Sequence, residues 1–176
     1  MLRRLFLVIA IMTVFVPSTA GSAAGGGRAP GLQDAVRATA SLHDIRQAQA
    51  AGYTVVVADL SGATCIEQPG EGAMGIHYLD PTLLDGVIDA TAPEALVYEP
   101  QPNGKLKLGA LEYLTMRSAW EAAGNSAPPS LFGQTFDLIE SPNRYGLPDF
   151  YALHAWIWRP NPSGIFAMWN PRVTCP

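Results

Sequence analysis

Basic residues are scarce in this sequence, and it lacks the motifs that would indicate a particular enzymatic reaction. Lysine and arginine number 11 against 15 acidic residues in 176. Without Arg3 and Arg4 nine basic residues remain (11 − 2), so the rest of the chain carries about six net negative charges. That balance disfavours nucleic acid or an anionic membrane as a partner. The sequence contains no Gly-x-Ser-x-Gly elbow and no phosphate-binding glycine loop, so serine hydrolases and nucleotide-binding proteins lack positive support.

The sequence also lacks an apolar run long enough to cross a bilayer. The longest run, Leu5 to Val16, has about a dozen residues, whereas a transmembrane helix needs roughly 20. Two arginines precede it, and Pro17 and small residues follow it. This three-part pattern predicts a secretory signal peptide over residues 1–24, with cleavage after Ala20 or Ala24. We therefore expect a secreted protein, extracellular or periplasmic, with no membrane span in the mature chain.

The remaining chain is short enough for one domain. Residues 25–31 read Gly-Gly-Gly-Arg-Ala-Pro-Gly and predict a flexible leader, because they have almost nothing to bury. Residues 32–176 are about 145 in number, which suits a single globular domain with one core. No linker, repeat or low-complexity tract divides them.

Cysteine occurs only twice, at Cys65 and Cys175. Because an exported chain meets an oxidising environment, we expect the two to form a disulfide bond. Such a bond would close a loop of about 110 residues, for which chain entropy predicts a stabilisation of roughly 4 to 5 kcal/mol. Two free thiols or an intermolecular bond are the alternatives.

The pattern of apolar residues predicts an α+β fold. An apolar stripe over residues 32–51 indicates an amphipathic N-terminal helix. Short helices are expected at residues 80–84 and 116–123, and strands at 53–59, 95–99, 106–113, 150–158 and 165–169. Asn103-Gly104 favours a hairpin between the second and third of these strands. We expect an antiparallel sheet or a small open β-barrel, with the N-terminal helix packed against it.

Three polar side chains lie inside apolar strand segments: His77, Glu112 and His154. Alternation from Lys105 to Tyr113 predicts that Glu112 shares the inward face with Leu106, Leu108 and Ala110, opposite the lysines. Buried groups of this kind need a partner. Two imidazoles and one carboxylate form the ligand set of a metal site with open coordination positions, suited to zinc, iron, copper or manganese.

Each candidate has a structural alternative. The histidines could be hydrogen-bonded core residues, and Glu112 could be paired with Arg159 or Arg172. Glu99, on the strand expected beside Glu112, could form an acid and base pair with it, because mutual repulsion separates two carboxyl pKa values. The alternative for Glu99 is that it ends its strand in water.

Aromatic residues concentrate near the C-terminus, where three of the four tryptophans lie between positions 156 and 169. On the predicted strand 150–158, Leu153, Ala155 and Ile157 share one face, and His154, Trp156 and Trp158 share the other. The tryptophans could form a wall that stacks a planar ligand, or they could simply fill the core. His43, near the polar face of the first helix, is expected to be a surface residue.

Three segments resemble an uncharacterised family of exported bacterial proteins. They are Gly-Ala-Met-Gly-Ile-His-Tyr-Leu-Asp-Pro (72–81), Pro-Glu-Ala-Leu-Val-Tyr-Glu-Pro (93–100) and the stretch from Leu153 to Pro171. The resemblance spans most of the mature chain. It implies export from a bacterial cell, and it implies no reaction, ligand or site residue.

Two hypotheses about function follow from the sequence. The first is a small-ligand or metal-binding domain that uses His77, Glu112 and His154, with a divalent transition metal as the cofactor. If no metal is bound, the same groups could act as general acid and base. The second is a non-catalytic secreted binding or interaction module, in which the aromatic segment is structural. The sequence leaves open whether the protein is an enzyme.

Overall fold

The computed structural model describes residues 29–176. The predicted signal peptide and residues 25–28 of the predicted leader lie outside the described residues. Folding begins earlier than the predicted boundary, because Ala29 already packs against the core and its carbonyl accepts a hydrogen bond from the backbone N–H of Leu32. Among the described residues, no helix combines the length and apolar character needed to cross a membrane.

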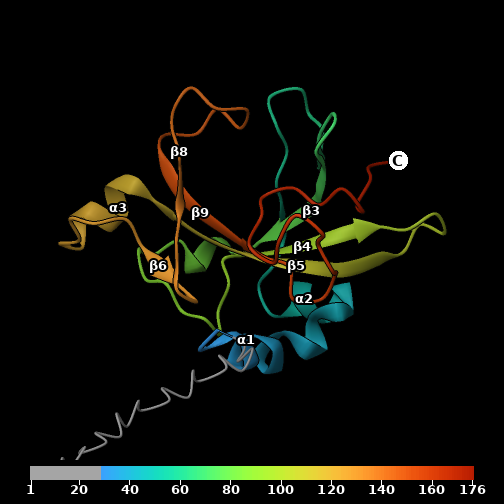
Figure 1. Cartoon of the computed structure of the whole chain (residues 1–176), viewed down its shortest axis with the longest axis horizontal. Helices are drawn as coiled ribbons and strands as arrows, with labels where there is room; N and C mark the ends of the chain where they lie inside the picture. The colour runs from blue at the N-terminus through green and yellow to red at the C-terminus, as the bar shows by residue number, and fades with distance from the viewer. Residues whose placement is uncertain (1–28) are drawn as a thin grey trace, which may run out of the picture.

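An open antiparallel sheet of seven strands forms the centre of the molecule (Figure 1), which confirms the predicted α+β class. Its order is β1-β3-β4-β5-β9-β8, and β2 also pairs with β3. The seven strands are β1 (Val55–Val56), β2 (Cys65–Gln68), β3 (Gly72–Leu79), β4 (Ala95–Pro100), β5 (Leu106–Met116), β8 (Asp137–Ile139) and β9 (Phe150–Ala155). Strands β6 (Ser130–Leu131) and β7 (Gln134–Thr135) form a separate pair. The predicted hairpin is present as β4 and β5.

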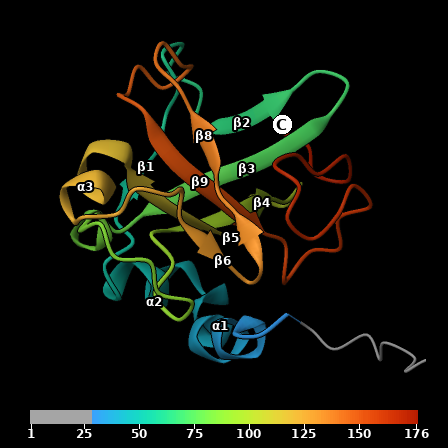
Figure 2. The same cartoon turned by 60° about the vertical axis from the view of Figure 1, so that its left-hand side comes forward.

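The N-terminal helical segment packs on one face of this sheet (Figures 1 and 2). It was expected to be one helix over residues 32–51, and it is three: α1 (Leu32–Thr39), η1 (Ala40–His43) and α2 (Ile45–Ala50). Asp44 breaks the helix, because it takes an extended conformation and its carboxylate accepts the backbone N–H of Arg46 to start α2. Apolar periodicity continues across the break, so the sequence pattern does not reveal it.

The two other short helices are confirmed. Asp80 caps η2 (Pro81–Leu83) by accepting a hydrogen bond from the backbone N–H of Thr82. Helix α3 (Arg117–Ala122) follows β5 directly, and Gly124 ends it in the left-handed conformation, with a φ of 89°.

The second face of the sheet is covered by the C-terminal segment. Val173 is fully buried there with Ile66, Met74 and Trp156. The predicted disulfide between Cys65 and Cys175 is present and joins β2 to the chain end across 110 residues. Both faces of the central strands are therefore buried, each under a different end of the chain.

A β-bulge at Gly109 corrects the predicted alternation on β5. Val97 pairs with Ala110, but the next residue, Tyr98, pairs with Leu108, so Gly109 is the extra residue. Leu106 and Leu108 consequently pack on the helix-covered face, whereas Ala110 packs on the opposite one. Glu112 therefore shares its face with Ala110 and not with the two leucines. It is buried as predicted, because both faces are covered.

The C-terminal strand predictions were too long. Strand β9 ends at Ala155, and residues 165–169 do not form a strand. The chain turns after Trp156, so Trp158 lies on the helix-covered face and its indole N–H donates to the hydroxyl of Thr39. The expectation that Trp158 shares a face with His154 was wrong. The predicted strand over residues 53–59 is reduced to two residues, β1.

Candidate metal centre

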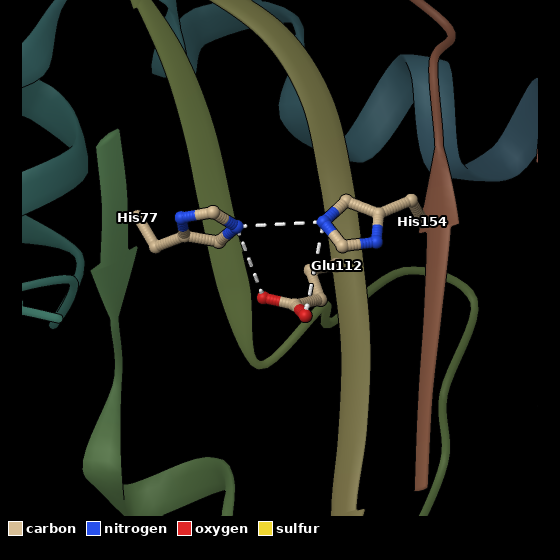
Figure 3. Close-up of side chains that lie close together, drawn as sticks. All are labelled: His77, Glu112 and His154. Carbon is tan, nitrogen blue, oxygen red and sulfur yellow. Dashed lines mark hydrogen bonds and ion pairs between the residues drawn. The ribbon is translucent and has the colours of Figure 1, made fainter. Parts of the chain in front are cut away.

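His77, Glu112 and His154 meet on the face of the sheet that lies away from the N-terminal helices (Figure 3). They come from β3, β5 and β9. Glu112 and His154 are direct cross-strand partners, so their side chains leave the sheet side by side. His77 pairs with Val97 on β4, which in turn pairs with Ala110 on β5, two residues before Glu112. The three predicted residues are thus placed together by strand register.

Ala95 explains how His77 and Glu112 can approach each other across the intervening strand β4. It is the cross-strand partner of Glu112 and also of Leu79, so its methyl group points to the same face. Ala95 is fully buried. A larger side chain at this position would stand between β3 and β5, where the imidazole of His77 reaches over toward the carboxyl group. The small residue therefore leaves the space in which the three groups meet.

The distances among the three groups are longer than hydrogen bonds to a charged group. The Nε2 atoms of His77 and His154 lie 3.4 Å apart. Glu112 Oε2 lies 3.5 Å from His77 Nε2, and Glu112 Oε1 lies 3.8 Å from His154 Nε2. Charge-assisted hydrogen bonds of this type normally measure about 2.7 to 2.9 Å. The three groups therefore contact one another only weakly, and the hydrogen bond between the two imidazoles is long.

Burial sets the protonation states of the isolated cluster. Both histidines are 3% exposed and Glu112 is 9% exposed. Loss of hydration lowers the pKa of His77 to about 4, an effect that the nearby backbone of Gly75 only partly offsets. Burial, and next the charge of His77, lower the pKa of His154 to about 3. Burial also raises the pKa of Glu112 to about 8. The metal-free cluster therefore favours neutral imidazoles and a protonated carboxyl group.

Nitrogen and carboxylate oxygen atoms in this arrangement can hold a metal ion. One ligand atom from each residue lies within 4.8 Å of the others. His77 Nδ1, the ring nitrogen that points away from the cluster, is buried and has no hydrogen-bond partner among the described residues. On the other side, the imidazole of His154 stacks on Trp156, with 6.3 Å between ring centroids. The outer nitrogen of His77 therefore has no hydrogen bond that would orient the ring, whereas the ring of His154 packs on Trp156.

Two apolar cavities adjoin the cluster, and Glu112 lines both. The first has a volume of about 180 Å³ and also contacts His77; the second has a volume of about 210 Å³ and contacts His154. Tyr145 and Phe150 line both cavities and separate them. Ligands could therefore approach the cluster from either side.

The loop that carries Tyr145 joins β8 to β9 and is tied down at several points. Asn143 accepts the backbone N–H groups of Tyr145 and Leu147, which shapes the turn. Arg144 forms an ion pair with Asp59 at 3.1 Å and donates to the carbonyl of Glu67. These contacts hold Tyr145 over the cluster. Loop residues of this kind were not anticipated, because segment 141–149 has no periodic pattern.

Among the described residues, neither arginine suggested as a partner of Glu112 forms an ion pair with it. Arg159 forms an ion pair with Glu99 at 3.2 Å and donates to the carbonyl of Arg172. Glu99 pairs across the sheet with Lys107, five positions before Glu112. It is partly buried in its ion pair rather than ending the strand in water. The acid and base pair of Glu99 with Glu112 is therefore not formed.

The tryptophans do not form one aromatic wall. Trp156 is buried on the same face as the cluster, and its indole N–H donates to the carbonyl of Ala167. Trp158 lies on the opposite face and contacts His43 edge-on, at 4.5 Å between ring centroids. Trp169 lines the second cavity beneath the guanidinium of Arg144. His43 thus packs on an aromatic ring, far from the other two histidines in the fold.

Sequence reasoning missed one buried carboxyl group, Glu94. It is 1% exposed, and its Oε2 accepts the backbone N–H of Leu114 at 3.0 Å. Burial raises its pKa to about 8. Its position just before β4 was the available signal, because Pro93 and Ala95 flank it with apolar neighbours.

No protein-family model, curated protein or solved structure matches the chain.

Proposed function

We propose that this protein is an exported domain that binds a divalent transition metal ion through His77, Glu112 and His154. The observation that carries the proposal is the spacing of the ligand atoms. Zinc binds imidazole nitrogen at about 2.0 to 2.1 Å, so neighbouring ligands stand about 3.4 Å apart in a tetrahedral site and about 3.0 Å apart in an octahedral one. The separation of 3.4 Å between the Nε2 atoms of His77 and His154 matches the tetrahedral value, and each Nε2 atom lies within 3.8 Å of one of the two carboxylate oxygens of Glu112.

The ligand set narrows the choice of ion. Imidazole and carboxylate suit zinc, iron, copper or manganese, whereas calcium and magnesium prefer all-oxygen sites. Three protein ligands leave at least one coordination position for water or a small molecule, as in catalytic zinc sites. An ion there would supply a Lewis acid, and the adjoining cavities provide room for a ligand beside it. The ligand residues lie on strands β3, β5 and β9 of one sheet, whose hydrogen bonding restricts their movement.

Metal binding can be tested directly on the purified protein. We expect elemental analysis to find about one transition metal ion per chain, or titration calorimetry to detect uptake of one Zn²⁺ or Co²⁺ after treatment with a chelator. His154→Ala should abolish uptake, because it removes one of three ligands. His43→Ala is the matched control, since it removes the remaining histidine of residues 29–176 and should leave uptake unchanged.

The same experiment decides between the two hypotheses drawn from the sequence. A non-catalytic module in which the histidines are structural would take up no ion, and His154→Ala would only lower stability. Uptake that is equal in the wild-type protein and in His154→Ala would also contradict the proposed site. Loss of uptake in His154→Ala, with uptake preserved in His43→Ala, supports it.

We also propose that the chain is exported and processed. The disulfide between Cys65 and Cys175 supports this part, because such bonds persist in oxidising compartments. N-terminal sequencing of protein recovered from the medium or periplasm of an expressing bacterium should begin at residue 21 or 25. Recovery only from the cytoplasm, with Met1 retained, would contradict it.

A further inference from the structure

The cavity beside His77 has a composition that defines what it can bind. Among the described residues that line it, Glu112 is the one charged side chain. Six apolar residues form most of the remaining wall: Val57, Leu79, Leu84, Leu114, Met116 and Phe150. Beyond the polar groups of His77, Glu112 and Tyr145, a polar molecule would lose hydration there without gaining partners. The cavity therefore favours an apolar group.

The volume of this cavity limits the size of that group. An apolar cavity of about 150 Å³ in another protein holds benzene. The cavity here measures about 180 Å³, so it accommodates a ring or chain of about six carbon atoms. Leu147, which is 42% exposed, lies at its rim, so the cavity is reached from solvent. The second cavity has Asn143 and Arg144 in its wall and is less uniformly apolar.

The metal centre adds a charge requirement. A divalent ion with one carboxylate and two neutral imidazoles carries one net positive charge. No other acidic side chain lines the cavity among the described residues, so this charge is uncompensated in apolar surroundings. A ligand with one negative group that coordinates the ion would neutralise it. The two requirements, a single anionic head and an apolar body, apply to the same molecule.

We propose that the site binds a small monoanionic molecule, such as a carboxylate, whose head group coordinates the metal ion and whose apolar body of about six carbon atoms fills the cavity beside His77. This inference rests on the proposed metal centre. It assigns the ligand class that the metal site alone leaves open.

A series of straight-chain carboxylates tests the proposal on Co²⁺-loaded protein, with the visible absorption of cobalt as the readout. Each buried methylene should tighten binding about fourfold, so hexanoate should bind on the order of 200-fold more tightly than acetate. Decanoate should depart from this trend, because its chain exceeds the cavity. Hexan-1-ol should bind far more weakly than hexanoate, because it lacks the negative charge.

A pair of variants tests where the alkyl chain of the carboxylate binds. Leu84→Trp fills the cavity from its rim, so it should remove the preference for hexanoate while acetate binding is retained. Leu138→Trp is the matched control: this residue is 37% exposed on β8, next to Ile139 but on the other side of the strand. It should keep the full chain-length preference.

The outcomes separate this inference from the metal centre itself. Absence of Co²⁺ uptake overturns both. If Co²⁺ is taken up but acetate and hexanoate bind with equal affinity, the proposed metal centre is retained and the proposed ligand class is overturned. A chain-length preference that persists unchanged in Leu84→Trp overturns the assignment to this cavity.

Discussion

Glu112→Gln should make the metal-free protein more stable and at the same time abolish metal binding. Burial raises the pKa of Glu112 from its ordinary value of 4.5 to about 8. A carboxyl group with a raised pKa contributes its full stability below pH 4.5, and that stability is lost as the pH rises toward 8. Glutamine has nearly the same shape as glutamate and does not ionise, so the variant keeps its stability as the pH rises.

The size of the effect follows from the same pKa. Each pH unit between the two pKa values changes the free energy of unfolding by about 1.4 kcal/mol. The variant should gain little over the wild-type protein at pH 4.5 and about 4 kcal/mol at pH 7.5, as an upper limit. Burial lowers the pKa values of His77 and His154, which costs stability in acid. Both proteins keep these histidines, so their effect cancels in the difference.

Urea denaturation in the presence of a chelator measures this difference at pH 4.5, 6.0 and 7.5. Glu71→Gln serves as the matched control, because Glu71 is exposed and the substitution should stay within about 0.5 kcal/mol at every pH. Excess Zn²⁺ should then cancel most of the advantage of Glu112→Gln at pH 7.5. A ligand present at 1,000 times its dissociation constant stabilises the folded wild-type protein by about 4 kcal/mol, and the variant should not respond.

Two results would refute this reasoning. If the advantage of Glu112→Gln over the wild-type protein did not grow with pH, the carboxyl group would not be desolvated as described. If Zn²⁺ stabilised both proteins equally, Glu112 would not be a ligand.

Three further predictions concern the disulfide and the strand residues that support the candidate site. Replacing both Cys65 and Cys175 by serine should lower the free energy of unfolding by about 4 to 5 kcal/mol, because the disulfide closes a 110-residue loop; urea denaturation measures it, and an unchanged midpoint would contradict it. Ala95→Val should weaken Zn²⁺ binding on the order of tenfold, because the added methyl groups enter the space between His77 and Glu112. Calorimetry would contradict this if the affinity were unchanged. Gly75→Ala should destabilise the fold by more than 1 kcal/mol, because its φ is 112° and an added Cβ would lie 2.5 Å from a backbone oxygen of β4; thermal unfolding at an unchanged temperature would contradict it.

Local signals were sufficient for several elements of the fold. Asn103-Gly104 identified the hairpin, because this dipeptide readily adopts the conformations that a tight turn requires. The Asp80-Pro81 pair identified a short helix, because its cap and first turn need those residue types. The disulfide followed from counting, since two cysteines in a chain that is expected to be exported allow a single intramolecular pair.

Local signals failed where backbone hydrogen bonds override periodicity. Leu106 and Leu108 appeared to share a face with Glu112, but the bulge at Gly109 moves them to the other side. The carbonyl of Gly109 accepts hydrogen bonds from the backbone N–H groups of Trp158 and Arg159. These partners lie about 50 residues away in the chain, so no window of sequence reveals them.

For the candidate site, the residue types and the apolar strand segments that carry them could be identified from the amino-acid sequence. An apolar strand that contains one carboxyl group or imidazole must bury it when both faces of the sheet are covered, and His77, Glu112 and His154 are buried accordingly. The convergence of the three side chains could not be predicted in this way. Convergence depends on the register of β3, β4, β5 and β9 and on the small side chain of Ala95 between them. Register is set by hydrogen bonds and packing between strands far apart in the chain, and the two cavities beside Glu112 exist only once those strands and the loop of Tyr145 have packed together.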